Sequence, residues 1–140
     1  MKYNGVIEVK LRIMEEKLGE IESWHIDSFQ TFCTSTLLQN AVERALQVII
    51  EAAIDTGERI LALEKEPPIS SSSAVISRLQ ELGKISNEKD YVDMVRFRNF
   101  IVHRYEKIDL EIVYAIVKKR LPVFRKFIDE VRRYQSLSNV

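Results

Sequence analysis

The stretch Met94-Val95-Arg96-Phe97-Arg98-Asn99-Phe100-Ile101-Val102-His103-Arg104-Tyr105 combines the apolar pattern of a buried helix with charged residues that burial does not require. On a straight helix, which advances by about 100° per residue, its apolar residues together with Tyr91 cover more than half of the circumference. The remaining narrow polar wedge holds Arg96, Asn99 and His103. Arg98 lies in the middle of the apolar side. Arginine is almost never fully buried without a partner, so the stretch predicts a largely buried helix whose arginine is either paired or functional.

Helical periodicity continues on both sides of this stretch. No segment shows the sustained apolar–polar alternation, bounded by turn residues, that predicts a strand. About five helices with short connections predict an all-α protein, an antiparallel helical bundle. A length of 140 residues is most simply one domain, covering residues 1–140. The expected helices cover residues 5–22, 37–63, 74–82, the segment with the quoted stretch, and a long final segment from about residue 110.

Cap and turn residues mark the ends of the expected helices. Thr34-Ser35-Thr36 and Asp109 are N-cap candidates. The segment from Asn87 to Asp90 resembles a capping box, with aspartate in place of glutamate. Pro122 is expected to kink the final helix or to divide it in two. Residues 24–32 are less periodic, and they either continue the first helix or form a corner.

The composition narrows the classes of function. Hydrophobic residues make up 46% of the chain and charged residues 30%, which suits a globular protein. The single cysteine, Cys33, suits a reducing cytosol, and one cysteine with two histidines nearly excludes a Cys/His zinc site. No run approaches the roughly 20 apolar residues that span a bilayer, and the first five residues lack the apolar core of a signal peptide. We therefore expect a cytoplasmic protein with no metal and no cofactor.

The charged residues are unevenly distributed. Residues 1–70 hold 12 acidic and 7 basic side chains, a net charge of −5, and residues 71–140 hold 9 and 14, a net charge of +5. A basic half is compatible with a phosphate-bearing partner, and a solvated helix face is the alternative interpretation. The basic residues of the final helix are Lys118, Lys119, Arg120, Arg125, Lys126, Arg132 and Arg133.

The pattern Arg98-Asn99-x-x-x-His103, followed by Arg104 and Tyr105, resembles the HEPN superfamily and, within it, the HepT ribonuclease toxins. The resemblance covers nearly the whole chain and is weakest over the first 35 residues. Glycine-rich phosphate loops, Gly-x-Ser-x-Gly elbows and His-Glu-x-x-His zinc motifs are absent. The other stretches that carry the resemblance are Glu43-Arg44-Ala45-Leu46-Gln47, Glu51-Ala52, Leu79-x-x-Leu82-Gly83-x-Ile85 and the start of the final helix at Asp109.

The resemblance implies a toxin of a toxin–antitoxin pair. This toxin would be a metal-independent endoribonuclease that works as a homodimer, with the site in the cleft between two copies of the motif helix. The implied partner is an MNT-type nucleotidyltransferase antitoxin, which would transfer AMP from ATP to the motif tyrosine, here Tyr105, and silence the nuclease. The alternative is a non-catalytic HEPN-type binding module that docks a nucleotidyltransferase or nucleic acid.

The motif residues fit cleavage of RNA by its own 2′-hydroxyl. His103 can give or take a proton near neutral pH, and Arg98 would stabilise charge on the phosphoryl group. Asn99 could orient the imidazole or contact RNA, and Arg96 could hold a phosphate. On one straight helix Arg98 and His103 point about 140° apart. A helix end, a long reach of the arginine or a second subunit is therefore needed to bring them to one phosphate.

Each of these residues also has a purely structural interpretation. Arg98 could pair with an acid such as Glu43 or Glu51, because a half-buried arginine needs a partner. His103 could be a satisfied histidine at a helix end, and Tyr105 a tyrosine at the edge of the core.

Overall fold

The computed structural model describes residues 5–102 and 109–138, which form seven α-helices and no strand. The expected all-α fold is confirmed, with two helices beyond the five expected. One is the short α2, which forms the corner left open after the first helix. The other arises because the final helix is divided into α6 and α7. The helices are α1 (Gly5–Ser23), α2 (Phe29–Cys33), α3 (Thr36–Leu63), α4 (Ser72–Glu81), α5 (Lys89–Val102), α6 (Leu110–Lys119) and α7 (Leu121–Ser138).

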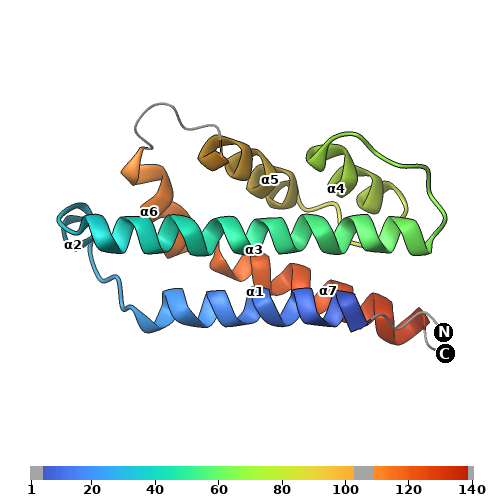
Figure 1. The fold of residues 1–140 in the computed structure, drawn as a ribbon, viewed down its shortest axis with the longest axis horizontal. Helices are drawn as coiled ribbons and strands as arrows, with labels where there is room; N and C mark the ends of the chain where they lie inside the picture. Colours follow the sequence, from blue (N-terminus) through green and yellow to red (C-terminus); the bar gives the residue numbers. More distant parts are fainter. Residues whose placement is uncertain (1–4, 103–108, 139–140) are drawn as a thin grey trace.

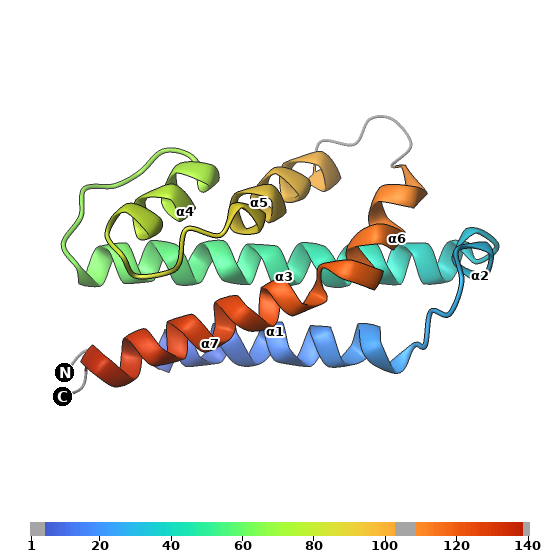
Figure 2. The same ribbon diagram turned by 180° about the vertical axis from the view of Figure 1, so that it is seen from behind.

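The long helix α3 is the central element of the fold (Figure 1). It packs against α1, α2, α4 and α5, and α1 runs antiparallel to it. Helices α4 and α5 lie on the side of α3 away from α1, while α7 crosses α1 on the face seen in Figure 2. The first turn of α1 and the last turn of α7 therefore lie at the same end of the bundle.

The apolar periodicity read from the sequence accounts for the core. In α1 the residues Ile7, Leu11, Met14 and Leu18 are fully buried, at the spacing of one helical face. Because α3 has neighbours on several sides, its buried residues extend around more than one face. Glu43 of α3 is accordingly buried, with 6% of its surface exposed.

Most of the predicted helix ends are confirmed. The Ser35 side chain accepts a hydrogen bond from the Leu38 backbone N–H at 3.1 Å and caps α3. Asp109 caps α6 by accepting from the Glu111 N–H at 2.9 Å. The predicted capping box at Asn87 is wrong, because α5 begins at Lys89 and the Asp90 carboxylate instead forms an ion pair with Arg120 at 3.0 Å.

Pro122 divides the last helix rather than kinking it. The helical conformation is interrupted at Arg120, and Pro122 is the second residue of the new helix α7. In the first turn of a helix the backbone N–H has no helical acceptor, so proline loses nothing there. This division lets α6 follow a different direction from α7 and reach across to α2.

Gly57 allows α4 to lie close to α3. A Cβ atom at this position would lie 2.8 Å from Val75 Cγ1 and 3.0 Å from Leu79 Cδ1, closer than a normal van der Waals contact. A glycine inside a helix costs about 1 kcal/mol relative to alanine, and here it makes room for the neighbouring helix.

Within the described ranges, no helix combines the length and hydropathy of a membrane span.

Candidate active site

Helix α5 presents the two faces that the sequence predicted. Tyr91 and Val95 are fully buried, whereas Arg96 and Asn99 of the polar wedge are exposed. Arg98 lies on the same side as the buried residues, but 29% of its side chain remains exposed. Arg98 is therefore more buried than Arg96 and Asn99, the two described residues of the polar wedge.

Arg98 points toward α3. Its Nη2 lies 3.8 Å from Glu51 Oε1, and its Nη1 donates a hydrogen bond to the Asn99 side-chain oxygen at 3.2 Å. The Nε atom is buried and has no hydrogen-bond partner. Glu51 is one of the two carboxylates considered from the sequence, so the paired-arginine interpretation is confirmed to this extent. The guanidinium nevertheless keeps N–H groups that no acceptor occupies.

The other two motif residues lie outside the described residues. These are His103, the predicted acid or base, and Tyr105, the predicted site of modification. The helical part of α5 is described as far as Val102. The predicted convergence of Arg98 and His103 on one phosphate therefore stays a prediction.

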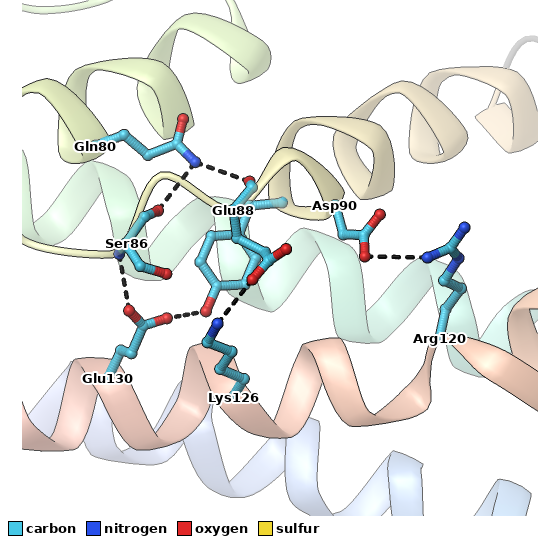
Figure 3. A network of polar contacts seen from close by, with 8 residues as sticks. Gln80, Ser86, Glu88, Asp90, Arg120, Lys126 and Glu130 are labelled. Carbon is cyan, nitrogen blue, oxygen red and sulfur yellow. Dashed lines mark hydrogen bonds and ion pairs between the residues drawn. The ribbon is translucent and has the colours of Figure 1, made fainter.

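A network of polar contacts fixes the start of α5 (Figure 3). Glu130 of α7 accepts hydrogen bonds from the Ser86 backbone N–H, at 2.8 Å, and from the hydroxyl of Tyr91. Gln80 of α4 donates to the carbonyl oxygens of Ser86 and Glu88 at 3.1 and 3.0 Å. The buried Tyr91 ring also makes an edge contact with Phe127, with 5.6 Å between the centroids.

Two ion pairs extend this network along α5. Lys126 of α7 lies 2.7 Å from Glu88, and Arg120 lies 3.0 Å from Asp90. The role of Glu130 was not predicted from the sequence. The available signal was its position at the edge of the apolar face of α7, beside Phe127 and Val131, where a carboxylate needs partners.

Most of the seven basic residues predicted for the final helix, between Lys118 and Arg133, have partners within the chain. Four of the seven form ion pairs: Arg120, Arg125, Lys126 and Arg132. Arg132 donates hydrogen bonds to Glu15 and Glu8, and these bonds raise the pKa of its guanidinium. The hydrogen bond from Arg132 in turn lowers the pKa of the Glu15 carboxyl. Much of the basic charge of the final segment is therefore paired with acidic side chains of the same chain.

An apolar surface lies beside the candidate site. Phe100, which the sequence placed in the core, is 44% exposed and stacks on Phe97 with 6.2 Å between ring centroids. Phe97 and the exposed Ile112 line a groove of about 220 Å³ between α5 and α6. Asp90 and Asp93 lie at this groove, so its chemistry suits an apolar protein surface better than a phosphate.

The described part of the chain holds no cluster of side chains that could form a metal site. In residues 5–102 and 109–138, no group of three or more histidine, cysteine or acidic side chains is arranged to hold a metal ion. The candidate site residues that the structure describes on α5 are Arg98, Asn99 and Arg96, which offer two guanidinium groups and an amide. Such groups bind and orient a phosphate, and proton transfer requires a further residue.

Comparison with known proteins identifies the family of this helical bundle. The model of the family described as ribonuclease HepT-like matches residues 14–131. This match spans most of the 140 residues, so the chain belongs to the ribonuclease HepT-like family. The resemblance first seen in the motif of α5 is thereby confirmed.

Two relatives of this chain are each slightly more than a quarter identical to it in sequence. The chain is 27% identical over 134 residues to a tRNA nuclease HepT of Aphanizomenon flos-aquae, covering 92% of this chain and 89% of the relative. It is 28% identical over 131 residues to an mRNA nuclease HepT of Shewanella oneidensis, covering 92% and 98%. The fold is similar to that of a tri-AMPylated Shewanella oneidensis HEPN toxin solved in complex with an MNT antitoxin. That structure gives a TM-score of 0.86 at 27% identity and covers 94% of this chain and 99% of the other.

Proposed function

We propose that this chain is the toxin of a toxin–antitoxin pair, a metal-independent endoribonuclease in which the 2′-hydroxyl of RNA is the nucleophile. One observation carries the proposal. In a chain of the ribonuclease HepT-like family, Arg98 is half-buried on the motif helix with a buried Nε that has no acceptor. A buried guanidinium N–H without an acceptor can bind a ligand with several acceptor oxygens, such as a phosphate.

Four residues, Arg96, Arg98, Asn99 and His103, have different roles in this reaction. Arg98 stabilises charge that develops on the phosphoryl oxygens, because its planar guanidinium presents fixed donors. His103 takes the proton of the 2′-hydroxyl or gives a proton to the leaving oxygen. Asn99, whose oxygen accepts from Arg98, orients the guanidinium or contacts RNA. Arg96 is 72% exposed and holds a neighbouring phosphate.

The active form is a homodimer, in which a second copy covers the apolar surface beside α5. Exposed Phe100 and the groove lined by Phe97 and Ile112 support this, because apolar surface next to a polar site is typical of a subunit interface. The predicted separation of Arg98 and His103 on one helix is a second reason for a shared site. The expected sedimentation mass is that of two chains, and Phe100→Asp is expected to yield monomers with strongly reduced cleavage.

The partner is an MNT-type nucleotidyltransferase that silences the toxin by transferring AMP to Tyr105. The solved Shewanella toxin is tri-AMPylated and was crystallised with an MNT antitoxin, which supports this regulation for the present chain. An AMP group adds an anion and bulk close to His103, so it would oppose RNA binding by charge and by sterics. We place the reaction in the cytoplasm and assign it to residues 1–140 as one domain.

RNA cleavage with a chelator present tests the reaction. Wild-type protein is expected to cut either transfer RNA or messenger RNA, the two substrates named for the relatives, and to leave a 2′,3′-cyclic phosphate. His103→Ala is expected to lose at least about 100-fold in rate, the usual size of an acid–base contribution. Cleavage that requires a divalent metal would refute the mechanism, and RNA binding without cleavage would favour the binding module.

Co-expression tests the silencing. The partner with ATP is expected to add the mass of AMP to the peptide that contains Tyr105, and to relieve the growth arrest that the toxin causes alone. The Tyr105→Phe variant is expected to remain toxic in the presence of the partner. If this variant is neutralised as well as wild type, silencing occurs by steric blocking rather than by modification.

A further inference from the structure

Among the described residues, Glu51 places beside Arg98 a carboxylate that the proposed reaction does not use. It lies on α3, on the face that α5 covers, and approaches Arg98 Nη2 to 3.8 Å. Figure 1 shows that α3 and α5 run antiparallel, and this contact joins a turn of α3 to a turn in the second half of α5. A carboxylate beside a phosphate-binding arginine needs a reason, because it repels the phosphate.

The contact with Glu51 restrains the Arg98 side chain only weakly. A separation of 3.8 Å is outside the range of a hydrogen bond. The side chains of Arg98 and Glu51 are 29% and 38% exposed, and ion pairs with this degree of exposure add little to folding stability. Glu51 therefore adds little to folding stability, but it lies where it can orient the Arg98 guanidinium.

A second residue holds the carboxylate in place. Gln47 lies one turn earlier on α3, and its side-chain amide donates to Glu51 Oε1 at 3.3 Å. On α5, Asn99 accepts from Arg98 Nη1 at 3.2 Å. The guanidinium is thus held on one side by α3 and on the other by its own helix, while its buried Nε remains without a partner.

We propose that Glu51, oriented by Gln47, is a positioning residue for Arg98: it holds the guanidinium in place before RNA binds and gives way to the substrate phosphate. This inference rests on the proposed nuclease function and deepens it. Positioning a group before the reaction raises the rate of the chemical step, because the group need not be ordered in the transition state. The same carboxylate weakens phosphate binding by its charge.

These two effects give the variant Glu51→Gln a distinctive kinetic signature. The amide keeps the shape and one acceptor oxygen but loses the charge, so kcat is expected to fall about fivefold, the size of a partly exposed ion pair. Loss of the repelling charge is expected to lower KM for RNA by about twofold. A residue that only stabilised the fold would lower the folded fraction and leave KM unchanged.

The control is Asp55→Asn, one turn later on α3. Asp55 pairs with Lys10 of α1 at 3.1 Å, and its side chain is 48% exposed. This variant also removes one carboxylate from α3, and kcat and KM are expected to stay at wild-type values. Gln47→Ala is expected to show the Glu51→Gln signature in weaker form. Equal kcat and KM in wild type and Glu51→Gln, or a change of the same size in Asp55→Asn, would refute the positioning role.

A second measurement is independent of RNA cleavage. Phenylglyoxal modifies accessible guanidinium groups, and peptide mass spectrometry reports the rate at Arg98. Glu51→Gln is expected to raise this rate about fivefold, since the restraint is that of a partly exposed ion pair, while Asp55→Asn leaves it unchanged. An unchanged rate in Glu51→Gln overturns the inference even if the nuclease activity stands. Wild-type protein that fails to cut RNA overturns the proposed function by itself, and a raised rate would then still support the restraint of Arg98 by Glu51.

Discussion

The two ends of helix α5 are held in different ways. The fixed end, from Glu88 to Tyr91, is bound to α4 and α7 through Gln80, Lys126 and Glu130. The open end, from Arg96 to Phe100, has two ion pairs at 3.8 Å, one to Asp93 of its own helix and one to Glu51. The difference teaches that one short helix can be placed accurately by its first turn while its last turns stay available to a ligand.

This arrangement agrees with the energetics of the two sets of contacts. Glu130 accepts from two donors, and a buried donor left without an acceptor costs about 1–3 kcal/mol, so the fixed end contributes to stability. Exposed ion pairs contribute about 0–1 kcal/mol, so the open end contributes little. We therefore expect substitutions at the open end to change activity and substitutions at the fixed end to change stability.

The largest expected effect is at the open end. Arg98→Ala is expected to lower RNA cleavage by about 100- to 1,000-fold, the loss typical of removing one donor to a developing oxyanion, with the midpoint of urea unfolding nearly unchanged. Steady-state RNA cleavage measures the loss of rate, and urea titration measures the midpoint of unfolding. Arg98→Lys serves as the control, because it keeps the charge without the fork of donors and should recover part of the rate. A large loss of stability in Arg98→Ala would mean that the open end also supports the fold.

The second effect is at the fixed end. Glu130→Ala leaves the Ser86 N–H and the Tyr91 hydroxyl without their acceptor, and is expected to destabilise the protein by about 2–3 kcal/mol. Chemical denaturation measures this change. The matched control is Glu88→Ala, which removes a carboxylate whose pair with Lys126 is 36–51% exposed and should cost less than about 1 kcal/mol. Equal stability losses in the two variants would contradict the special role of Glu130.

A smaller effect is expected for Arg96, again at the open end. Its side chain is 72% exposed, so Arg96→Ala should change stability by less than about 0.5 kcal/mol. Cleavage at low salt is expected to fall about threefold, because one phosphate contact is lost, and the difference should shrink as salt screens that contact. Cleavage rates of wild type and Arg96→Ala, measured over a range of ionic strength, test this salt dependence. A threefold loss that persists at high salt would point to a role in the chemical step.

The smallest expected effect concerns a reference pair far from α5, Glu15 and Arg132. The Arg132 hydrogen bond lowers the pKa of Glu15 below its ordinary value of 4.5. The pair therefore stabilises the protein fully above about pH 4.5, and this contribution is lost as the pH falls through the lowered pKa of the folded state. Both side chains are more than a third exposed, so the gain is discounted to below about 1 kcal/mol.

Urea unfolding of wild type and Arg132→Gln between pH 7 and pH 3 measures this contribution. The difference in unfolding free energy should be present at pH 7 and disappear at the acidic end. RNA cleavage at pH 7 should be the same in both proteins. A difference that grows toward low pH would contradict the assignment of the pKa shift to Arg132.

Local sequence signals predicted the helices well because each signal acts within a few residues. Ser35 and Asp109 cap the helices that they were expected to cap, and Pro122 interrupts the last helix. The polar wedge of α5 was also correct for Arg96 and Asn99, since helical periodicity alone places them on the exposed side. The extra helix α2 falls where the periodicity was weak.

Contacts between distant helices were not predictable in the same way. The pairing of Arg98 with Glu51 was one of several possibilities, because periodicity gives the face of a helix but not the register between two helices. Phe100 was expected in the core, yet the fold leaves its face partly uncovered. The position of Glu130 at the edge of an apolar face indicates that it needs partners but not which ones, because its two donors come from residues 44 and 39 positions earlier in the chain.

The position of Glu130 and Lys126 in α7 has a consequence for the order of synthesis. A ribosome makes α5 before α7, and N-terminal parts of a chain begin to fold while later parts are still being made. Until α7 has emerged, the first turn of α5 lacks the carboxylate and the ammonium group that hold it. A nascent chain, or one truncated before Lys126, would therefore carry every motif residue without the support that places α5, so that a toxin built on this plan acquires an ordered site only when its translation is nearly complete.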